Sequence, residues 1–494
     1  MKRYTLIKIL TLAVLGIFTV QCDSFGDFGD MNVDPNTPSQ PNTSYLYIDA
    51  VKQSVPSFYL TGTYDPWAII YVQYFSERTN IQFTTYSGTL FAVGGYYTRT
   101  LKDLDRIIKL NTDDATKGQT NVTMLGASNA NQIAVARTLR AYVYMHLTDA
   151  VGMIPYSEAL GAFEGNFKPK YDDQQSIYND LEKELNEAYT QFVEGQNLSS
   201  TYEILYKGDI AKWKKLNASV RMQLAIKLFK NDASNGQTRF AKAFADGFIR
   251  ENADILEYKY LNENANQNPL YDNMVVSARR DFYPSKTLVD ALKDYNDPRL
   301  EEYAEPNAAG EFVGMPFGLP QSQASTYAMT DICNFHPKHY RQNSPAVVIT
   351  PSIMLLAAAE AAERGWISAN AKSLYEEAIA KAFDQHGISA DELAPYLAQP
   401  AVAYKTGGTS AERIAQIAMQ KWFASYMQDS FEAWSDWRRL GIPELKPGPN
   451  TVVDAIPVRR MYSTDDYNAN KEAYAAAIAA QGADLLSTKI WWNK

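Results

Sequence analysis

The sequence predicts a mainly α-helical protein, a scaffold of tetratricopeptide-like helix pairs with long loop-rich insertions. Apolar residues recur at helical spacing through most of the chain, whereas the strict alternation typical of strands is scarce. The helical segments come in consecutive pairs, and stretches containing Pro, Asn and Gly separate them. No strict repeat of about 34 residues survives, which a helical-repeat scaffold with large insertions explains.

The N-terminal segment has the features of an export signal. A short basic start at Lys2 and Arg3 precedes the weakly polar to apolar run "ILTLAVLGIFTV", which ends at Val20. This run is shorter than the roughly 20 apolar residues of a membrane-spanning helix. We therefore predict a signal peptide over residues 1–21. A buried core helix or an anchoring helix is the alternative interpretation.

Cys22 stands directly behind this run, where a thiol suits lipid attachment after cleavage. The preceding residues, Thr19-Val20-Gln21, depart from the usual bacterial pattern of Leu, a small residue, and Gly or Ala. Two or more acyl chains would hold the protein on a membrane. Residues 22–41 combine spaced acids with Gly, Ser, Asn, Thr and Pro, so they are expected to form a flexible tether. The mature chain would keep only Cys333 and form no intrachain disulfide.

Residues 42–494 are expected to form a single domain, and helix pairs are predicted along it. The first lies near 131–192, where Ile177, Leu181, Leu185 and Ala188 mark one apolar face. The second lies near 209–249. Each pair would bury its apolar stripes against its neighbours.

The third pair, near 351–386, resembles a tetratricopeptide repeat most closely. "PSIMLLAAAEAAER" begins with a proline suited to a first helical turn and ends before Gly365. In the following helix Ala371, Tyr375 and Ala378 have the small, aromatic, small pattern that lets paired helices approach closely. A further long helix is predicted near 411–428.

Composition restricts the class of ligand. A net charge of -9 and a pI near 5.2 argue against nucleic acid, whose binding depends on Lys and Arg. The chain holds 33 Tyr, 8 Trp and 21 Phe, and rings with a polar tip suit amphipathic ligands such as sugars. Any single ring is nevertheless more often a core residue than a ligand contact.

Several blocks together resemble one known family. They include "MNVDPNTPSQ", "RTLRAYVYMHLTDAVGMIPYSEAL", "GDIAKWKKLNASVRMQLAIKLF", "NDPRL", "AAAEAAERGW", "QKWFASYMQDSFEAWSDWRRLGIPEL" and "STKIWWNK". In this order, from Met31 to Lys494, the chain resembles the SusD/RagB-like nutrient-binding outer-membrane lipoproteins of Bacteroidetes. The resemblance implies a lipid-anchored protein on the extracellular face of the outer membrane. It would cover a SusC-like TonB-dependent barrel and help to capture oligosaccharides or sometimes peptides.

In this family loop-rich segments form the ligand site, so the irregular segments near 64–97 and 279–339 are the candidate loops. Sugars bind by stacking on aromatic rings while amide, carboxylate and guanidinium groups bind their hydroxyls. The predicted ligand-binding residues are the rings of Trp67, Tyr86, Phe282, Tyr283 and Tyr327, with Asn80, Arg279 and Arg280 as polar partners.

Other functions have less support in the sequence. Cys333, His336 and His339 are potential zinc ligands, but no second cluster completes a tetrahedral site, so no metal and no cofactor is expected. No nucleophile elbow, phosphate loop or dinucleotide motif is present, and binding is favoured over catalysis, although a pair of carboxylates would suffice for a glycosidase. The alternative to a glycan receptor is a helical-repeat lipoprotein that binds a peptide or protein and no sugar.

The proposed lipid anchor predicts the behaviour of one variant. Cys22→Ala should move the protein from the membrane fraction to the soluble fraction after detergent-free lysis, because the acyl chains have no other attachment site. Ultracentrifugation followed by immunoblotting measures the distribution. If the variant stays in the membrane fraction, lipid attachment at Cys22 is not what holds the protein there.

Overall fold

The described part of the chain is built from neighbouring helices that share one large hydrophobic core. The computed structural model describes residues 41–59, 66–88 and 90–494, and Thr43–Lys494 form one compact unit. The predicted signal peptide and, apart from Pro41, the predicted tether lie outside the described residues, as does Cys22. No described helix is long and apolar enough to cross a membrane.

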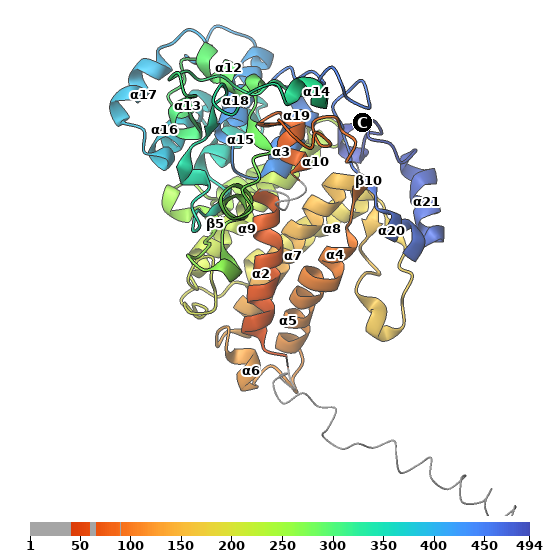
Figure 1. Cartoon of the computed structure of the whole chain (residues 1–494). Coiled ribbons are helices and arrows are strands. Elements are labelled where there is room, and N and C mark those ends of the chain that lie inside the picture. Colours follow the sequence, from red (N-terminus) through yellow and green to blue (C-terminus); the bar gives the residue numbers. More distant parts are fainter. Residues whose placement is uncertain (1–40, 60–65, 89) are drawn as a thin grey trace, which may run out of the picture. The chain divides into compact units, whose positions relative to one another are not determined.

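Four helices from the first part of the chain lie side by side in the lower half of Figure 1: α2 (Thr43–Tyr59), α5 (Lys102–Thr112), α7 (Asn129–Val151) and α8 (Gln174–Gln191). Helix α8 begins where Asp173 caps the backbone N–H of Ser176, and its apolar face buries Ile177, Leu181 and Leu185. The next pair is α9 (Ile210–Ile226) and α10 (Ala233–Asp246). Periodicity indicated α7 to α10, whereas α2 and α5 were not predicted.

The tetratricopeptide-like character is clearest in α15 (Pro351–Glu363) and α16 (Ala371–His386). Helix α15 buries a run of alanines, and α16 packs on it through Tyr375 and Ala378, which are fully buried. Small side chains on α15 let the two helices approach closely. Gly387 ends α16 in the left-handed conformation, at φ 77°, that an L side chain rarely adopts. The predicted helix-pair fold is therefore confirmed.

The remaining described helices are shorter or lie in the second half of the chain. They are α3 (Trp67–Tyr71), α4 (Gly94–Tyr96), α6 (Thr120–Thr123), α11 (Pro269–Tyr271), α12 (Lys286–Asp294), α13 (Arg299–Tyr303), α14 (Gln321–Ala324), α17 (Ala390–Leu397), α18 (Ser410–Ala424), α19 (Ser430–Leu440), α20 (Thr464–Ala469) and α21 (Lys471–Gln481).

Strands are few and short, as the sequence indicated. Within the described residues they form five two-stranded sheets. Four are antiparallel: β1 (Phe75–Glu77) with β6 (Phe282–Pro284), β3 (Ile154–Pro155) with β4 (Tyr171–Asp172), β5 (Leu256–Tyr258) with β9 (Ala346–Ile349), and β7 (Ala304–Glu305) with β8 (Asn334–Phe335). The pair β2 (Leu90–Phe91) and β10 (Met461–Tyr462) is parallel. Each pair joins loops that are distant in the sequence or fixes a local turn.

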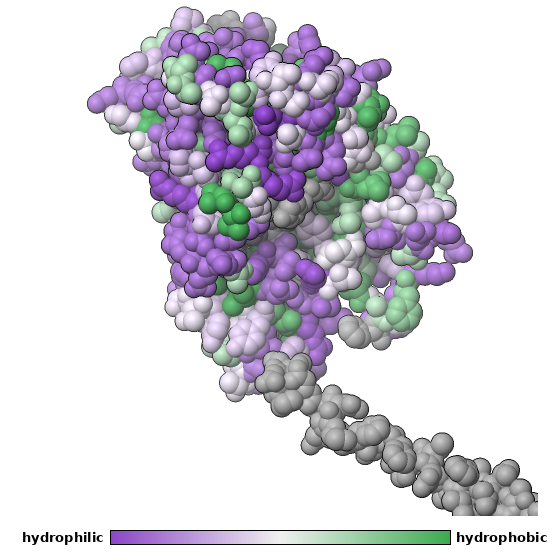
Figure 2. All heavy atoms as spheres, viewed as in Figure 1, coloured by the Kyte–Doolittle hydropathy of each residue, from purple (hydrophilic) through white to green (hydrophobic). Residues whose placement is uncertain are grey.

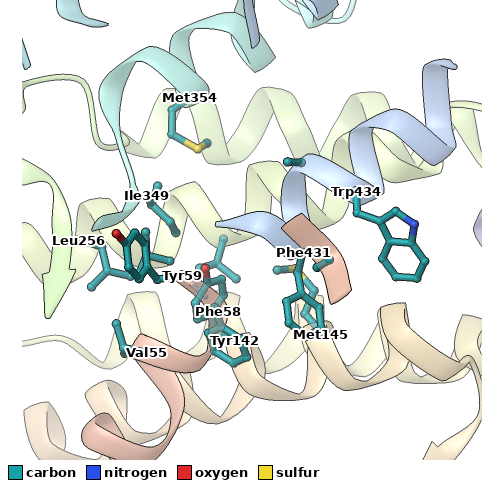
Figure 3. Packing of buried hydrophobic residues seen from close by; sticks show 14 of the residues in the cluster. Val55, Phe58, Tyr59, Tyr142, Met145, Leu256, Ile349, Met354, Phe431 and Trp434 are labelled. Carbon is teal, nitrogen blue, oxygen red and sulfur yellow. The ribbon is translucent and has the colours of Figure 1, made fainter. Parts of the chain in front are cut away.

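Aromatic rings from α2, α7 and α19 meet in the core, as Figure 3 shows. Phe58 stacks on the imidazole of His146 with 3.9 Å between ring centroids. It also packs edge-on against Tyr142 at 5.2 Å and Phe431 at 5.8 Å. These contacts join the N-terminal helix to a helix near the C-terminus, so the fold closes only when both ends of the domain are in place.

Helix α19 carries buried charges that other helices neutralise. Glu360 of α15 accepts hydrogen bonds from both terminal nitrogens of Arg439, at 2.5 and 2.6 Å, and from Nε of Arg364 at 2.8 Å. Burial alone would raise the pKa of Glu360, but these guanidinium groups hold it below its ordinary value. The carboxylate is therefore charged at neutral pH and depends on its partners.

Glu360→Gln should destabilise the protein by about 3–5 kcal/mol, because it leaves Arg439 and Arg364 in the core without their shared carboxylate. Equilibrium denaturation would measure the loss. The matched control is Glu376→Gln, which breaks an exposed pair with Lys372 and should cost at most about 0.5 kcal/mol. Equal effects of the two substitutions would contradict the proposed role of the buried pair.

Candidate functional site

The two predicted loop segments meet at one place in the structure. Strands β1 and β6 pair antiparallel with Glu77 opposite Phe282, and the N–H of Arg78 donates to the carbonyl of Asp281 at 2.8 Å. The ladder therefore joins the segment after α3 to the segment before α12, which are about 200 residues apart in the sequence. Side chains at its open end come from both loops.

Asp281 is the centre of the polar contacts at this end. Its Oδ1 accepts hydrogen bonds from Oγ1 of Thr79 at 2.6 Å and Nδ2 of Asn80 at 2.9 Å, and its Oδ2 accepts from Nε of Arg279 at 2.9 Å. The carboxylate is buried, whereas Asn80 and Arg279 remain exposed. Two predicted polar residues are thus brought to one carboxylate that the sequence analysis did not select. The only sequence signal for it is its position directly after Arg279 and Arg280.

A second carboxyl group holds the loop that follows β1. Oε2 of Glu77 accepts hydrogen bonds from the N–H groups of Phe83 and Thr84, at 3.0 and 2.7 Å, and from Oγ1 of Thr84 at 2.9 Å. Burial raises the pKa of Glu77 to about 8, although these hydrogen bonds oppose the rise. Burial therefore favours the protonated, uncharged form of Glu77 more than it does for an ordinary carboxyl group.

A later part of the second predicted loop, around α14, covers the side of the ladder. Nε of Arg78 donates to the carbonyl of Tyr327 at 2.6 Å, and Nε2 of Gln321 donates to the carbonyl of Arg78 at 3.1 Å. Beneath them lies a small apolar cluster of Tyr283, Met315, Ala324 and Ile332, against which Tyr327 packs. The segment 316–330 of this loop is thereby fixed beside the ladder.

The structure separates the predicted aromatic residues into two groups. Phe282 and Tyr327 are half-buried, Phe282 against the large hydrophobic core and Tyr327 against the small apolar cluster. Trp67, Tyr86 and Tyr283 are buried, so they offer no ring face to a ligand arriving from solvent in this conformation. The prediction that these three rings stack on a ligand therefore does not agree with their burial in the structure.

The physical reason is contact with distant parts of the chain. The ring of Trp67 packs edge-on against Phe431 and Trp434, at 4.7 and 5.0 Å, and the guanidinium of Arg460 lies 5.0 Å from it. Tyr86 packs edge-on against the nearby Tyr71 at 5.4 Å and in a tilted arrangement against the distant Phe317 at 6.2 Å. These rings stabilise the base of the loop and do not line its surface.

The accessible residues of the site are Phe282, Tyr327, Asn80, Arg279 and Arg280. Two partly open rings beside amide and guanidinium donors can stack on an apolar face and bind hydroxyl or acidic oxygens of a ligand. We call these five residues, with Arg78 and Asp281, the ladder site. Their arrangement suits binding, since the two carboxyl groups nearby, those of Glu77 and Asp281, are engaged in hydrogen bonds.

The residues considered as zinc ligands have structural contacts instead. Cys333 is buried, and Nε2 of His339 lies 3.1 Å from the carbonyl of Glu302. The side chain of His336 accepts the N–H of Lys338 at the start of a short 3-10 helix. Within the described residues no three His, Cys, Asp or Glu side chains are grouped so as to hold a metal ion.

The surface seen in Figure 2 is mostly hydrophilic over the part that carries α12, α13 and α17, with hydrophobic residues in small separate groups. Such a surface is typical of a domain that faces water.

Comparison with known proteins gives one family and many similar structures. The model of a SusD-like family, described as "Starch-binding associating with outer membrane", matches residues 35–463. A structure described as a chitin-binding protein is 26% identical, with a TM-score of 0.76, over 92% of this chain and 100% of its own. A Bacteroides vulgatus outer membrane protein, described as involved in nutrient binding, is 26% identical with a TM-score of 0.78 over the same shares.

A chitin-binding SusD homolog from Flavobacterium johnsoniae has the same fold at 21% identity, with a TM-score of 0.76, over 92% of this chain and 98% of its own. A search of curated proteins found no match.

The raised pKa of Glu77 predicts a pH dependence of stability. A carboxyl group that is protonated in the folded state and ionised in the unfolded state stabilises the fold below its ordinary pKa of 4.5, and this contribution is lost as pH rises through about 8. Glu77→Gln keeps a neutral acceptor and should remove this loss. We expect the melting temperature of the native protein to fall relative to the variant between pH 5 and pH 9, as measured by calorimetry. Parallel pH profiles would show that Glu77 does not titrate in this way.

Proposed function

Because the chain belongs to the SusD-like family described as starch-binding and associating with the outer membrane, we propose that it is a glycan-binding lipoprotein of the cell surface. On this proposal it binds oligosaccharides at the ladder site and delivers them to a SusC-like TonB-dependent transporter. Cys22 would carry the lipid anchor, on the extracellular face of the outer membrane.

The observation that supports this function best is the convergence of the two loops at the β1–β6 ladder. These loops carry the half-buried residues Phe282 and Tyr327, which pack against the large core and the small apolar cluster respectively, and the exposed residues Asn80, Arg279 and Arg280. Protein sites for sugars need this combination, because a sugar ring has apolar C–H faces and a rim of hydroxyl groups. The chitin-binding protein at 26% identity supports the same ligand class.

The rigidity of the surroundings also supports a binding role. Asp281 fixes Asn80 and Arg279, and Glu77 fixes the backbone of the adjoining loop, so the donors are held before a ligand arrives. A site arranged in advance loses less conformational entropy on binding.

The first experiment is a glycan array probed with the purified full-length protein in mild detergent, beside a pool of peptides. Selective binding to one class of glycan supports the proposal. Binding to peptides alone would favour the alternative, a helical-repeat scaffold with no sugar ligand, and binding to neither panel would count against a nutrient receptor.

Tyr327→Ala should weaken binding of the selected glycan about tenfold or more, because it removes a stacking surface worth at least about 1.4 kcal/mol. Titration calorimetry measures the change. The matched control is Tyr467→Ala, which removes a tyrosine that is 41% exposed on α20, outside the ladder site. Unchanged affinity in the Tyr327 variant, or equal losses in both, would place the ligand elsewhere.

A further inference from the structure

The ladder site contains more arginine than free carboxylate. Arg78 directly follows β1 and donates its N–H to the carbonyl of Asp281, and Arg279 and Arg280 directly precede Asp281, the residue before β6. Asp281 is already occupied, because Arg279 binds Oδ2 through Nη2 at 2.7 Å while Thr79 and Asn80 fill Oδ1. One carboxylate therefore neutralises one of the three guanidinium groups.

Arg78 and Arg280 have no ion-pair partner within the part of the chain that the structure describes. Arg78 donates through Nε to the carbonyl of Tyr327, and Arg280 is exposed. Burial raises the pKa of the Tyr283 hydroxyl, and the positive charges of Arg78 and Arg280 oppose that rise. The same hydroxyl is buried and has no hydrogen-bond partner among the described residues.

The other charged groups around the site do not cancel the excess of positive charge from Arg78 and Arg280. Glu77 is buried, and burial raises its pKa to about 8, which disfavours a negative charge on it. Glu305, at the end of β7, helps burial to raise the pKa of Tyr340, and Arg280 opposes it there. Burial lowers the pKa of His336; the negative charge of Glu305 opposes this shift, and the positive charge of Arg341 adds to it. The site is thus cationic on a chain whose net charge is -9.

We propose that the ladder site takes an acidic oligosaccharide, one that carries carboxylate or sulfate groups, and that Arg78 and Arg280 bind those groups. This inference rests on the proposed glycan-binding function and names the class of glycan. The planar guanidinium matches the two oxygens of a carboxylate or a sulfate, and such charge-assisted pairs are stronger than hydrogen bonds to sugar hydroxyls. Neutral sugars would leave both charges uncompensated.

Titration calorimetry with two matched sets of oligosaccharides tests this inference on the full-length protein in mild detergent. The acidic probes are oligogalacturonate and chondroitin sulfate oligosaccharides, and the neutral probes are chitin and maltose oligosaccharides of equal length. We expect at least one acidic probe to bind about tenfold or more tightly than any neutral probe at low salt. Its affinity should fall as sodium chloride is raised, because salt screens the exposed charges.

Substitutions of the two arginines test whether they bind the acidic groups of the ligand. Arg280→Gln and Arg78→Gln should each weaken binding of the acidic probe about tenfold and weaken binding of a neutral probe less, because a neutral probe loses a hydrogen bond but no charge pair. Arg106→Gln removes an exposed arginine from α5, outside the site, and should change neither. Circular dichroism before and after heating checks that each variant is folded, and the two site variants are independent tests.

Other outcomes would contradict either the acidic ligand class or the glycan-binding function itself. If neutral probes bind as tightly as acidic ones, or if Arg280→Gln and Arg78→Gln leave acidic binding unchanged, the acidic ligand class is wrong while the glycan receptor stands. If no oligosaccharide of either class binds, the proposed function itself fails and the inference fails with it.

Discussion

Helix α19 carries charged side chains into the core, and the rest of the structure depends on their neutralisation by other helices. Asp429, which caps this helix, accepts a hydrogen bond from Tyr142 and lies 2.9 Å from the imidazole of His146. Glu432 pairs with Lys227, and Arg439 pairs with Glu360. An unpaired charge in the core costs several kcal/mol, so α7, the end of α9 and α15 must all be in place around α19.

The same helix positions the candidate site. Trp434 of α19 packs on Trp67 of α3, and α3 is followed by β1, the first strand of the ladder. Helix α18 fixes the connection between them, because the indole of Trp422 donates to the carbonyl of Val72 at 3.1 Å. Ser285 then donates its N–H to the carbonyl of Tyr74 at 3.0 Å, which brings the second loop alongside. A rigid helical scaffold thus holds two loops that carry the exposed side chains.

The abundance of tyrosine has a structural explanation that differs from ligand binding. Many of the rings are buried, and their hydroxyls donate to backbone carbonyls or carboxylates of distant segments. Tyr303, for example, donates to the carbonyl of Phe423 at 2.9 Å, near the end of α18, and Tyr178 donates to Asp149. A tyrosine can fill the core and satisfy a polar group at its far end, which phenylalanine cannot. Composition alone therefore overstates the number of rings that a ligand can contact.

The sequence by itself determined the helical class, the helix pairs from α7 to α10 and α15 to α16, and the two loops that meet at the site. These features depend on local periodicity and on caps such as Asp173 and Gly387, which act within one or two turns of helix. Only the tertiary structure decided which side chains of the loops stay accessible. Contact with Trp434 buries Trp67, whereas Tyr327 stays half-buried. Asp281 becomes the centre of the site because Thr79 and Asn80 donate hydrogen bonds to its carboxylate. Such contacts join residues about 200 to 370 positions apart in the chain, so no local pattern around either partner encodes them.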